Sequence, residues 1–449
     1  MDGSRAVEIE GLINRQRLGP LNFWYVAVLL AALTVDGFDL QVMGFTAPSL
    51  VRDWHVSRAA LAPVFSASLV GILVGAFMFG ALGDRFGRKR AVIAASLLYG
   101  LFSVACIWST SLWELGLLRF VTGVGIGGVI PNVLALSTEL APRRHRAILT
   151  SLVLVGLNLG SALPGVVRTW FPAEHEWRAL FLVGGLAPIA VAILLALTLP
   201  ESILFLVHRG VRRPELERRA KRLDPQLDID AQTRFVLAEP TAPGASSLKA
   251  IFAGRFAVIT PLLWVVFAAT LFTIFIRSSW MPLLLDDAGV SRGRVASISV
   301  LIEAGGAVSG VLAGFMLGRL GLAWVIGLIL LACAGVAGLA LAGVSGYGLE
   351  MAALAFGLGN MGAQAAMNTS ASLIYPVNCR PTGVGAALGV GRFGAVLGPL
   401  IGGAIVALGA TPRDMFLVPL VPLALAAIAL LWLRRLADVR SPPASAMAD

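Results

Sequence analysis

The sequence is poor in charged residues, histidine and cysteine. Asp, Glu, Lys and Arg make up 13% of its 449 residues, about half the share of an average soluble domain. Hydrophobic residues make up 57%, and the mean hydropathy is +0.85. Ordinary water-soluble folds and disordered chains are therefore excluded. The three cysteines lie far apart in apolar sequence with no histidine nearby, so we expect no disulfide framework, zinc site or iron–sulfur site.

The chain also lacks the sequence patterns of an enzyme or an ATP-driven pump. It shows no P-loop, no nucleophile–base set and no metal-binding cluster, so no cofactor and no metal are expected. Its net charge of +10 does not indicate a nucleic-acid-binding protein, because the basic residues lie between long apolar runs, as they do in membrane proteins. The first 20 residues are polar, and no cleavable signal peptide is expected.

What the sequence has in abundance is long apolar runs. Between the polar start, the polar stretch 200–255 and the tail from Ala437 there is room for twelve transmembrane helices, at about 30 residues for a helix and its loop. We expect an all-α integral membrane protein of two six-helix halves, 1–199 and 256–449, joined by a cytosolic central loop, 200–255. The expected spans are 22–49, 59–82, 89–108, 112–139, 147–168, 178–199, 256–285, 293–317, 322–343, 348–374, 382–408 and 413–435.

The distribution of basic residues indicates which side of the membrane each loop faces. Basic clusters at 85–90 and 143–146 follow the second and fourth spans, and the central loop is also basic. Basic loops lie in the cytosol, so both termini are expected there. The two loops recur at one common offset after the eighth and tenth spans, as Arg319, Gly321, Pro376 and Arg380 for Arg85, Gly87, Pro142 and Arg146. Parallel half-repeats of this kind occur in membrane transporters.

The loop after the second span carries a recognisable motif, Gly80-Ala-Leu-Gly-Asp84-Arg85-Phe-Gly87-Arg88-Lys89-Arg90. It resembles the G-x-x-x-D-R-x-G-R-[RK] signature of the major facilitator superfamily. Glycine allows a tight turn between helix ends, and a carboxylate can accept backbone N–H groups at a helix N-terminus. The resemblance implies a gating element that latches the cytosolic side in the outward-open state, formed by Gly80, Asp84, Arg85, Gly87 and Arg88. The alternative is a basic loop that only sets topology.

Two carboxylates lie on one face of the first span. Asp36 and Asp39 are three residues apart, and residues at this spacing share a helical face. A carboxylate near the bilayer centre is costly, so it is protonated, paired or exposed to water. Such a group can bind and release a proton as its access to water alternates. The alternative is a polar pair that only packs helices together.

Three runs narrow the resemblance to one family. Asp36-Gly-Phe-Asp39, the run from Arg119 to Arg146 and the run from Tyr375 to Gly403 resemble the aromatic acid:proton symporter family. This likeness covers nearly the whole chain. It implies a bacterial inner-membrane importer of benzoate-like acids, coupled to protons through Asp36, Asp39, Arg119 and Glu139. Arg119 lies at about the depth of Asp39, so we expect these two side chains to pair.

An aromatic carboxylate needs a cation, polar groups for ring hydroxyls and an apolar wall. Arg392, near the midplane of the eleventh span, is the first candidate to bind the carboxylate; alternatively, it binds helix carbonyls. The other candidates are Arg277, the stripe Asn360, Gln364 and Asn368, and Asn158, Trp280 and Phe38. Amides in a span can equally join helices, and isolated aromatic side chains can simply pack.

Arg277 and Glu303 depart from the family pattern. They lie at similar depths on neighbouring antiparallel spans, so we expect an ion pair, since either buried charge alone is costly. The pair either holds Arg277 toward the substrate or is purely structural. The departures leave the exact substrate open. The alternatives to an importer of aromatic acids are a symporter for a non-aromatic organic acid or a zwitterion, and a transporter-like chemoreceptor. The expected partners are a small aromatic carboxylate, protons and the lipid bilayer, with no nucleic acid, and we expect a monomer.

Overall fold

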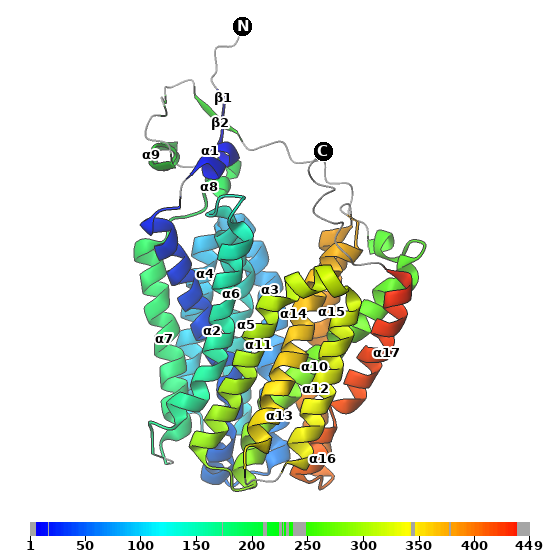
Figure 1. Cartoon of the computed structure of the whole chain (residues 1–449). Coiled ribbons are helices and arrows are strands. Elements are labelled where there is room, and N and C mark those ends of the chain that lie inside the picture. The colour runs from blue at the N-terminus through cyan, green and yellow to red at the C-terminus, as the bar shows by residue number, and fades with distance from the viewer. Residues whose placement is uncertain are drawn as a thin grey trace.

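A computed structural model describes residues 6–16, 18–172, 174–209, 213–223, 227, 229, 233–236, 248–342, 346–376 and 379–437. Long helices run side by side between two ends of the molecule (Figure 1). The helix α1 (Ile9–Arg15) and the last turn of α17 (Leu420–Leu436) lie at the same end. We call this the inner end, because the positive-inside rule assigns it to the cytosol. The expected tail from Ala437 lies outside the described residues, apart from Ala437 itself.

The long helices form two groups, which we call the N-terminal bundle and the C-terminal bundle. The N-terminal bundle contains α2 (Pro20–Trp54), η1 (Arg58–Leu61), α3 (Ala62–Phe86), α4 (Arg88–Ala105), η2 (Cys106–Trp108), α5 (Leu112–Glu139), α6 (Arg146–Arg168) and α7 (Glu176–Thr198). The C-terminal bundle contains η3 (Leu248–Phe252), α10 (Phe256–Asp287), α11 (Arg292–Leu320), α12 (Leu322–Leu341), α13 (Gly348–Phe356), η4 (Gly357–Met361), α14 (Gly362–Ile374), α15 (Arg380–Ala407), α16 (Pro412–Leu417) and α17. The main contacts between the bundles are α6 with α11, α3 with α15 and α2 with α10.

Among the described residues, eleven helices are long and apolar enough to cross a membrane. They match eleven of the twelve expected spans. The expected span 348–374 is instead three consecutive segments, because five residues between α13 and α14 form a π-helix, η4. Two glycines of η4 lie against neighbouring backbones: a Cβ on Gly357 would collide with Ile302 of α11, and one on Gly359 with Ala332 of α12. Single π-helical turns within a helix often occur at functional sites.

Glycine also sets how closely α2 approaches α6. A Cβ added to Gly37 would collide with the backbone of Leu157, and one added to Gly160 would collide with the backbone of Thr34. Small residues at such positions let membrane helices pack backbone against backbone. Asp36 and Asp39, which flank Gly37 and Phe38, are thereby held inside the N-terminal bundle rather than on its lipid-facing side.

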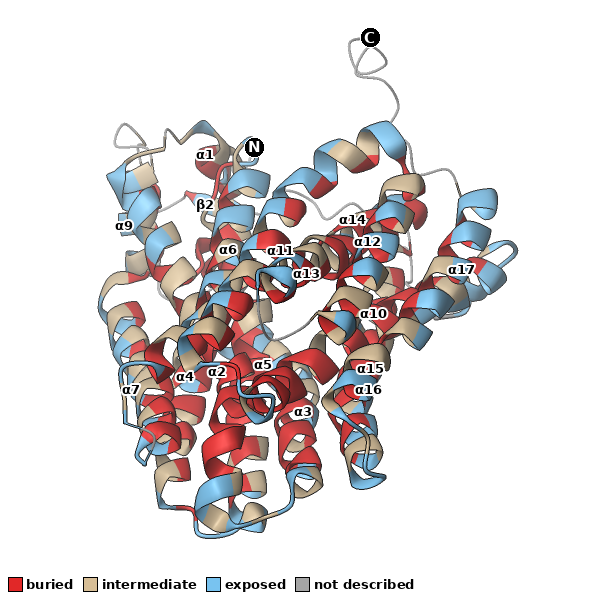
Figure 2. Ribbon diagram, turned by 60° about the horizontal axis from the view of Figure 1, so that its bottom comes forward, coloured by how far each residue is buried: buried red, intermediate tan, exposed pale blue. Residues whose placement is uncertain are grey.

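The outer surface of the molecule is apolar. Phe77, Trp113 and Leu197 are 73%, 75% and 79% exposed, and many other large hydrophobic side chains share this exposure. Buried residues gather along the inner sides of the helices (Figure 2). A soluble monomer rarely exposes apolar surface on this scale, whereas a lipid-facing surface requires it. The chain is therefore a multi-pass membrane protein, and its spanning part is helical, as expected.

A small folded unit at the inner end was not expected from the sequence. This cap consists of β1 (Ala6–Glu8), α1, α8 (Ile203–Arg209), α9 (Arg213–Leu223) and β2 (Arg234–Val236). The two strands pair in parallel, with Val7 opposite Phe235, and apolar side chains of α1 pack with those of α8 and α9. The polar start and the expected central loop thus contain regular structure, including two strands in a chain expected to be all-α. Residues 210–212, 224–226, 228, 230–232 and 237–247 of the central loop lie outside the described residues.

Candidate functional site

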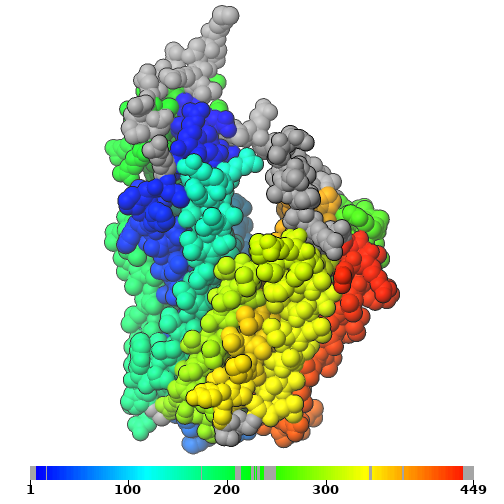
Figure 3. Space-filling view, viewed as in Figure 1, coloured from blue at the N-terminus to red at the C-terminus, as the bar shows by residue number. Residues whose placement is uncertain are grey.

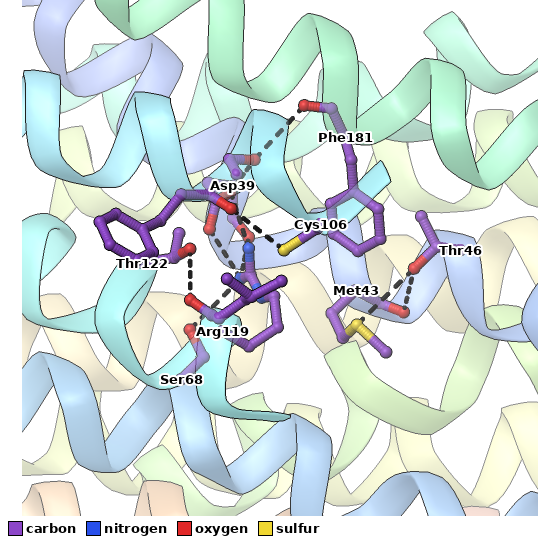
Figure 4. Close-up of polar contacts among 11 residues, drawn as sticks. Asp39, Met43, Thr46, Ser68, Cys106, Arg119, Thr122 and Phe181 are labelled. Atoms are coloured by element: carbon purple, nitrogen blue, oxygen red, sulfur yellow. Dashed lines mark hydrogen bonds and ion pairs between the residues drawn. The ribbon is translucent and has the colours of Figure 1, made fainter. Parts of the chain in front are cut away.

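A buried ion pair joins α2 to α5 inside the N-terminal bundle (Figure 4). Two guanidinium nitrogens of Arg119 bind the two carboxylate oxygens of Asp39 at 2.9 and 2.7 Å. The side chains of Arg119 and Asp39 are 1% and 0% exposed. Ser68 accepts a further hydrogen bond from Arg119 at 3.2 Å, and Ser103 donates to Asp39 at 3.4 Å. Asp39 is thus held on both oxygens, at the depth that the sequence analysis expected; its role in coupling stays a prediction.

Asp36 lies one turn before Asp39 on the same helix, in a contrasting environment. It is 0% exposed, and neither of its carboxylate oxygens has a hydrogen-bond partner among the described residues. The half-buried Arg392 of α15, in the other bundle, is near enough to act on Asp36 electrostatically but forms no ion pair with it. The buried hydroxyl of Tyr99, also without a hydrogen-bond partner, lies within electrostatic reach of both aspartates. Sequence reasoning missed Tyr99, because a single tyrosine in an apolar span gives no signal.

The pair expected between α10 and α11 is present and includes a third residue. Arg277 lies 3.4 Å from a carboxylate oxygen of Glu303, and the two side chains are 5% and 3% exposed. Gln41 of α2 donates to the same oxygen at 3.2 Å, so Glu303 also connects the two bundles. The guanidinium group of Arg277 lies over the ring of Phe356, 5.7 Å from its centroid. Sequence reasoning missed Gln41, although it is a polar residue close to Asp39 in an apolar run.

We expect Glu303→Gln to destabilise the protein by about 3–5 kcal/mol, because it leaves the buried Arg277 without its counter-charge. The double change Arg277→Gln/Glu303→Gln should cost much less, since it leaves no uncompensated charge. Thermal unfolding of the purified variants in detergent measures both effects. Glu303→Gln should also impair transport strongly, whereas the double change should impair folding only slightly. Wild-type stability and uptake in Glu303→Gln alone would mean that the pair contributes nothing.

The polar stripe of the tenth span bonds mainly to α10 and to itself. Thr270 of α10 donates to Gln364 at 2.5 Å, Gln364 donates to Asn368 at 3.2 Å, and Asn360 donates to the carbonyl of Thr270 at 3.3 Å. The side-chain oxygen of Asn360 is buried and has no hydrogen-bond partner among the described residues. Asn360 belongs to the π-helical turn η4. A buried, unpaired acceptor at an irregular turn is available to a donor group on a bound molecule.

The remaining substrate candidates are less well placed to bind a ligand. The Trp280 indole is 1% exposed; it donates to the carbonyl of Pro399 at 3.2 Å and packs edge-on against Phe65. Phe38 is 5% exposed and lies against Gly184 of α7. Both therefore fit the packing alternative. Asn158 is half-buried on α6 and makes no hydrogen bond to another described residue.

The motif loop lies at the inner end, between α3 and α4. Gly87 adopts a φ of +108°, a conformation that favours glycine. Asp84 forms an ion pair with Arg88, which also donates to Asn132 of α5 at 3.3 Å. Arg88 lies 4.0 Å from Glu139. These contacts stay within the N-terminal bundle, so the latch expected for an outward-open state is not formed by Asp84 and Arg88 in this conformation.

Two further predicted gating residues, Gly80 and Arg85, and the predicted coupling residue Glu139 also lie near this loop. A Cβ on Gly80 would meet nothing within 4 Å, so no close packing requires glycine there. The guanidinium group of Arg85 lies over the ring of Phe86. Glu139 ends α5, about 30 Å along that helix from Arg119 at 1.5 Å per residue. The structure therefore groups Glu139 with Arg88 of the motif loop and not with Asp36 and Asp39.

Comparisons with known proteins agree with this arrangement. The sequence pattern of the Major Facilitator Superfamily matches residues 29–392. A gallate transporter of Pseudomonas putida is 36% identical, over 91% of each chain, and the 4-hydroxybenzoate transporter PcaK of Pseudomonas aeruginosa is 36% identical, over 95% of each chain. A bacterial homologue of the human lysosomal transporter Spinster, in an inward-facing and unoccupied conformation, superposes with a TM-score of 0.72 at 17% identity, over 95% of this chain and all of that one. The chain belongs to the Major Facilitator Superfamily and, within it, to the aromatic-acid transporters.

Proposed function

We propose that the protein is a proton-coupled symporter that imports an aromatic carboxylic acid across the bacterial inner membrane by alternating access. Relatives that transport gallate and 4-hydroxybenzoate support the class of substrate. Rocking of the N-terminal half (1–199) against the C-terminal half (256–449) supplies the alternation. Glu139, beside Arg88, takes part through the motif loop at the inner end.

The observation that carries the proposal is the contrast between the two aspartates. Asp39 is fixed by Arg119 on both oxygens, whereas the buried Asp36 has no hydrogen-bond partner among the described residues. A buried carboxylate that accepts no hydrogen bond is costly while it is charged and gains from binding a proton. Asp36 is therefore the proton carrier, and the pair of Asp39 with Arg119 positions it.

Coupling of proton binding to substrate binding follows from the interaction of Asp36 with a positive charge in the other bundle. Arg392 is the cation within reach of Asp36. While Asp36 is ionised, it competes with any substrate carboxylate for Arg392. Once Asp36 is protonated from outside, Arg392 can bind the substrate carboxylate, so the proton binds before the anion. The unpaired side-chain oxygen of Asn360 then accepts a hydrogen bond from a ring hydroxyl.

Uptake by purified protein in liposomes tests the function. We expect radiolabelled 4-hydroxybenzoate to accumulate only when an inward proton gradient is imposed, and unlabelled benzoate to compete for uptake. Succinate and glycine betaine should not compete. Competition by either of them, without competition by benzoate, would favour a symporter for another organic acid or a zwitterion. Binding of 4-hydroxybenzoate without any uptake would favour a chemoreceptor.

Arg392→Lys is expected to weaken substrate binding about tenfold or more, although the charge is kept. Lysine lacks the planar fork that holds a carboxylate through two parallel hydrogen bonds. Equilibrium binding of labelled 4-hydroxybenzoate to the purified variant measures the effect, with Arg85→Lys as a control at an arginine of the motif loop. Unchanged affinity in Arg392→Lys would transfer the carboxylate site to Arg277.

A further inference from the structure

Charged side chains from both bundles meet at the outer end, opposite the cap. They lie at helix ends or just beside them, where the long helices turn. The N-terminal bundle contributes Arg52, Arg58, Arg168 and Glu176, and the C-terminal bundle contributes Asp286, Asp287 and Arg292.

Four ion pairs among these residues cross from one bundle to the other. Arg168 binds Asp286 at 3.0 Å, and Arg52 lies 3.7 Å from the other oxygen of the same carboxylate. Arg58 binds Asp287 at 2.8 Å. The fourth pair has the opposite polarity: Arg292 of the C-terminal bundle lies 3.1 Å from Glu176 of the N-terminal bundle. The pairs therefore tie the two bundles together through four separate contacts.

Arg168 is the centre of this set. Its side chain and that of Glu176 are both 0% exposed, and they pair within the N-terminal bundle. Arg168 thus bridges an internal carboxylate and one from the other bundle. A guanidinium group buried to this extent is costly unless its charge is compensated. Separating the bundles removes Asp286 but leaves Glu176, so Arg168 stays compensated when the outer end opens.

Packing beneath the ion pairs is tight. A Cβ on Gly44 of α2 would collide with the carbonyl of Ser278 on α10. The cavity that remains there has a volume of about 20 Å³, and its lining includes Gly44, Ser279 and Arg119. This is room for about one water molecule. This cavity beside Arg119 is therefore too small to hold an aromatic acid in this conformation. At the inner end, in contrast, Figure 3 shows the two bundles standing apart.

We infer that Arg52, Arg58, Arg168, Glu176, Asp286, Asp287 and Arg292 form an outer gate that is closed by electrostatic attraction. The cross-bundle pairs hold the outer end shut while the inner end is open. They must break and become hydrated before the outer end can open, so their strength sets the balance between the two states. This inference extends the proposed function but needs neither the proton carrier nor the substrate that it names.

Accessibility of one engineered cysteine tests the gate. Ser279, 7% exposed beneath the ion pairs, is replaced by cysteine after Cys106, Cys333 and Cys379 have been changed to serine. Intact cells are then treated with a membrane-impermeant thiol reagent, without substrate. Asp286→Asn should raise the labelling rate of Ser279→Cys about tenfold, because it removes the partner that Arg168 and Arg52 share across the bundles.

Matched controls separate gating from general damage. Asp53→Asn removes a carboxylate that binds Trp177 within the N-terminal bundle, and Glu350→Gln removes one that pairs with Arg294 within the C-terminal bundle; neither should change the labelling rate. Arg58→Asp and Asp287→Arg should each raise it, and the double change should restore it. Unchanged labelling in Asp286→Asn, or equal increases in the controls, would overturn the inference. Because no transport is measured, failure of the proposed function leaves this result intact.

Discussion

Asp36→Asn is expected to abolish proton-driven accumulation, so that the internal substrate concentration rises only to the external one. Asparagine cannot ionise, and a carrier that moves no proton gains nothing from the proton gradient. Exchange of internal for external substrate should continue, because asparagine resembles the protonated side chain and leaves Arg392 free for the anion. Uptake and counterflow of labelled 4-hydroxybenzoate in liposomes measure the two activities separately.

Asp36→Glu provides the control for this expectation. It keeps an ionisable group displaced by one methylene, and part of the gradient-driven accumulation should return. Loss of exchange together with accumulation in Asp36→Asn would show that the side chain is needed for binding or folding instead. Full accumulation by Asp36→Asn would remove Asp36 from the coupling role altogether.

Asp39→Asn is expected to act mainly on stability, with a loss of about 3–5 kcal/mol. The change leaves Arg119, which is 1% exposed, without the carboxylate that binds two of its nitrogens. The double change Asp39→Asn/Arg119→Gln should recover most of the loss. Asp36→Asn, which removes a buried charge without hydrogen-bond partners, should not destabilise the protein. Unfolding temperatures of the four proteins in detergent test this contrast, and a fully stable Asp39→Asn variant would contradict it.

The ion pairs between spans were predictable where the depth of two residues in the membrane alone decides which side chains meet. Counting residues from the membrane surface brings Asp39 to Arg119, and Arg277 to Glu303, because a helix rises a fixed distance per residue. Depth does not say which faces meet across the bundles. The bond from Gln41 to Glu303 therefore could not be predicted, and neither could the electrostatic influence of Arg392 on Asp36.

Other features left too weak a pattern in the sequence. Arg52, Arg58 and Arg168 count only as outer arginines in a topology argument, because Asp286 and Asp287, which tie them to the other bundle, are remote in the sequence. The π-helical turn widens a helix by one residue without changing its composition, so hydropathy does not reveal it. A three-residue strand such as Ala6–Glu8 is too short to show alternation, and its partner is remote in the sequence.

The pairing of β1 with β2 also has a consequence for biosynthesis. Ala6 pairs with Arg234, and Glu8 with Val236, so β1 leaves the ribosome long before its partner has been translated. Domains of a growing chain fold in the order of their synthesis. All the helices of the N-terminal bundle are translated between the two strands, and α8 and α9 follow them. The strand pair is thus a late event in the maturation of this half, and a nascent chain arrested before residue 234 carries an unpaired β1 at the membrane surface.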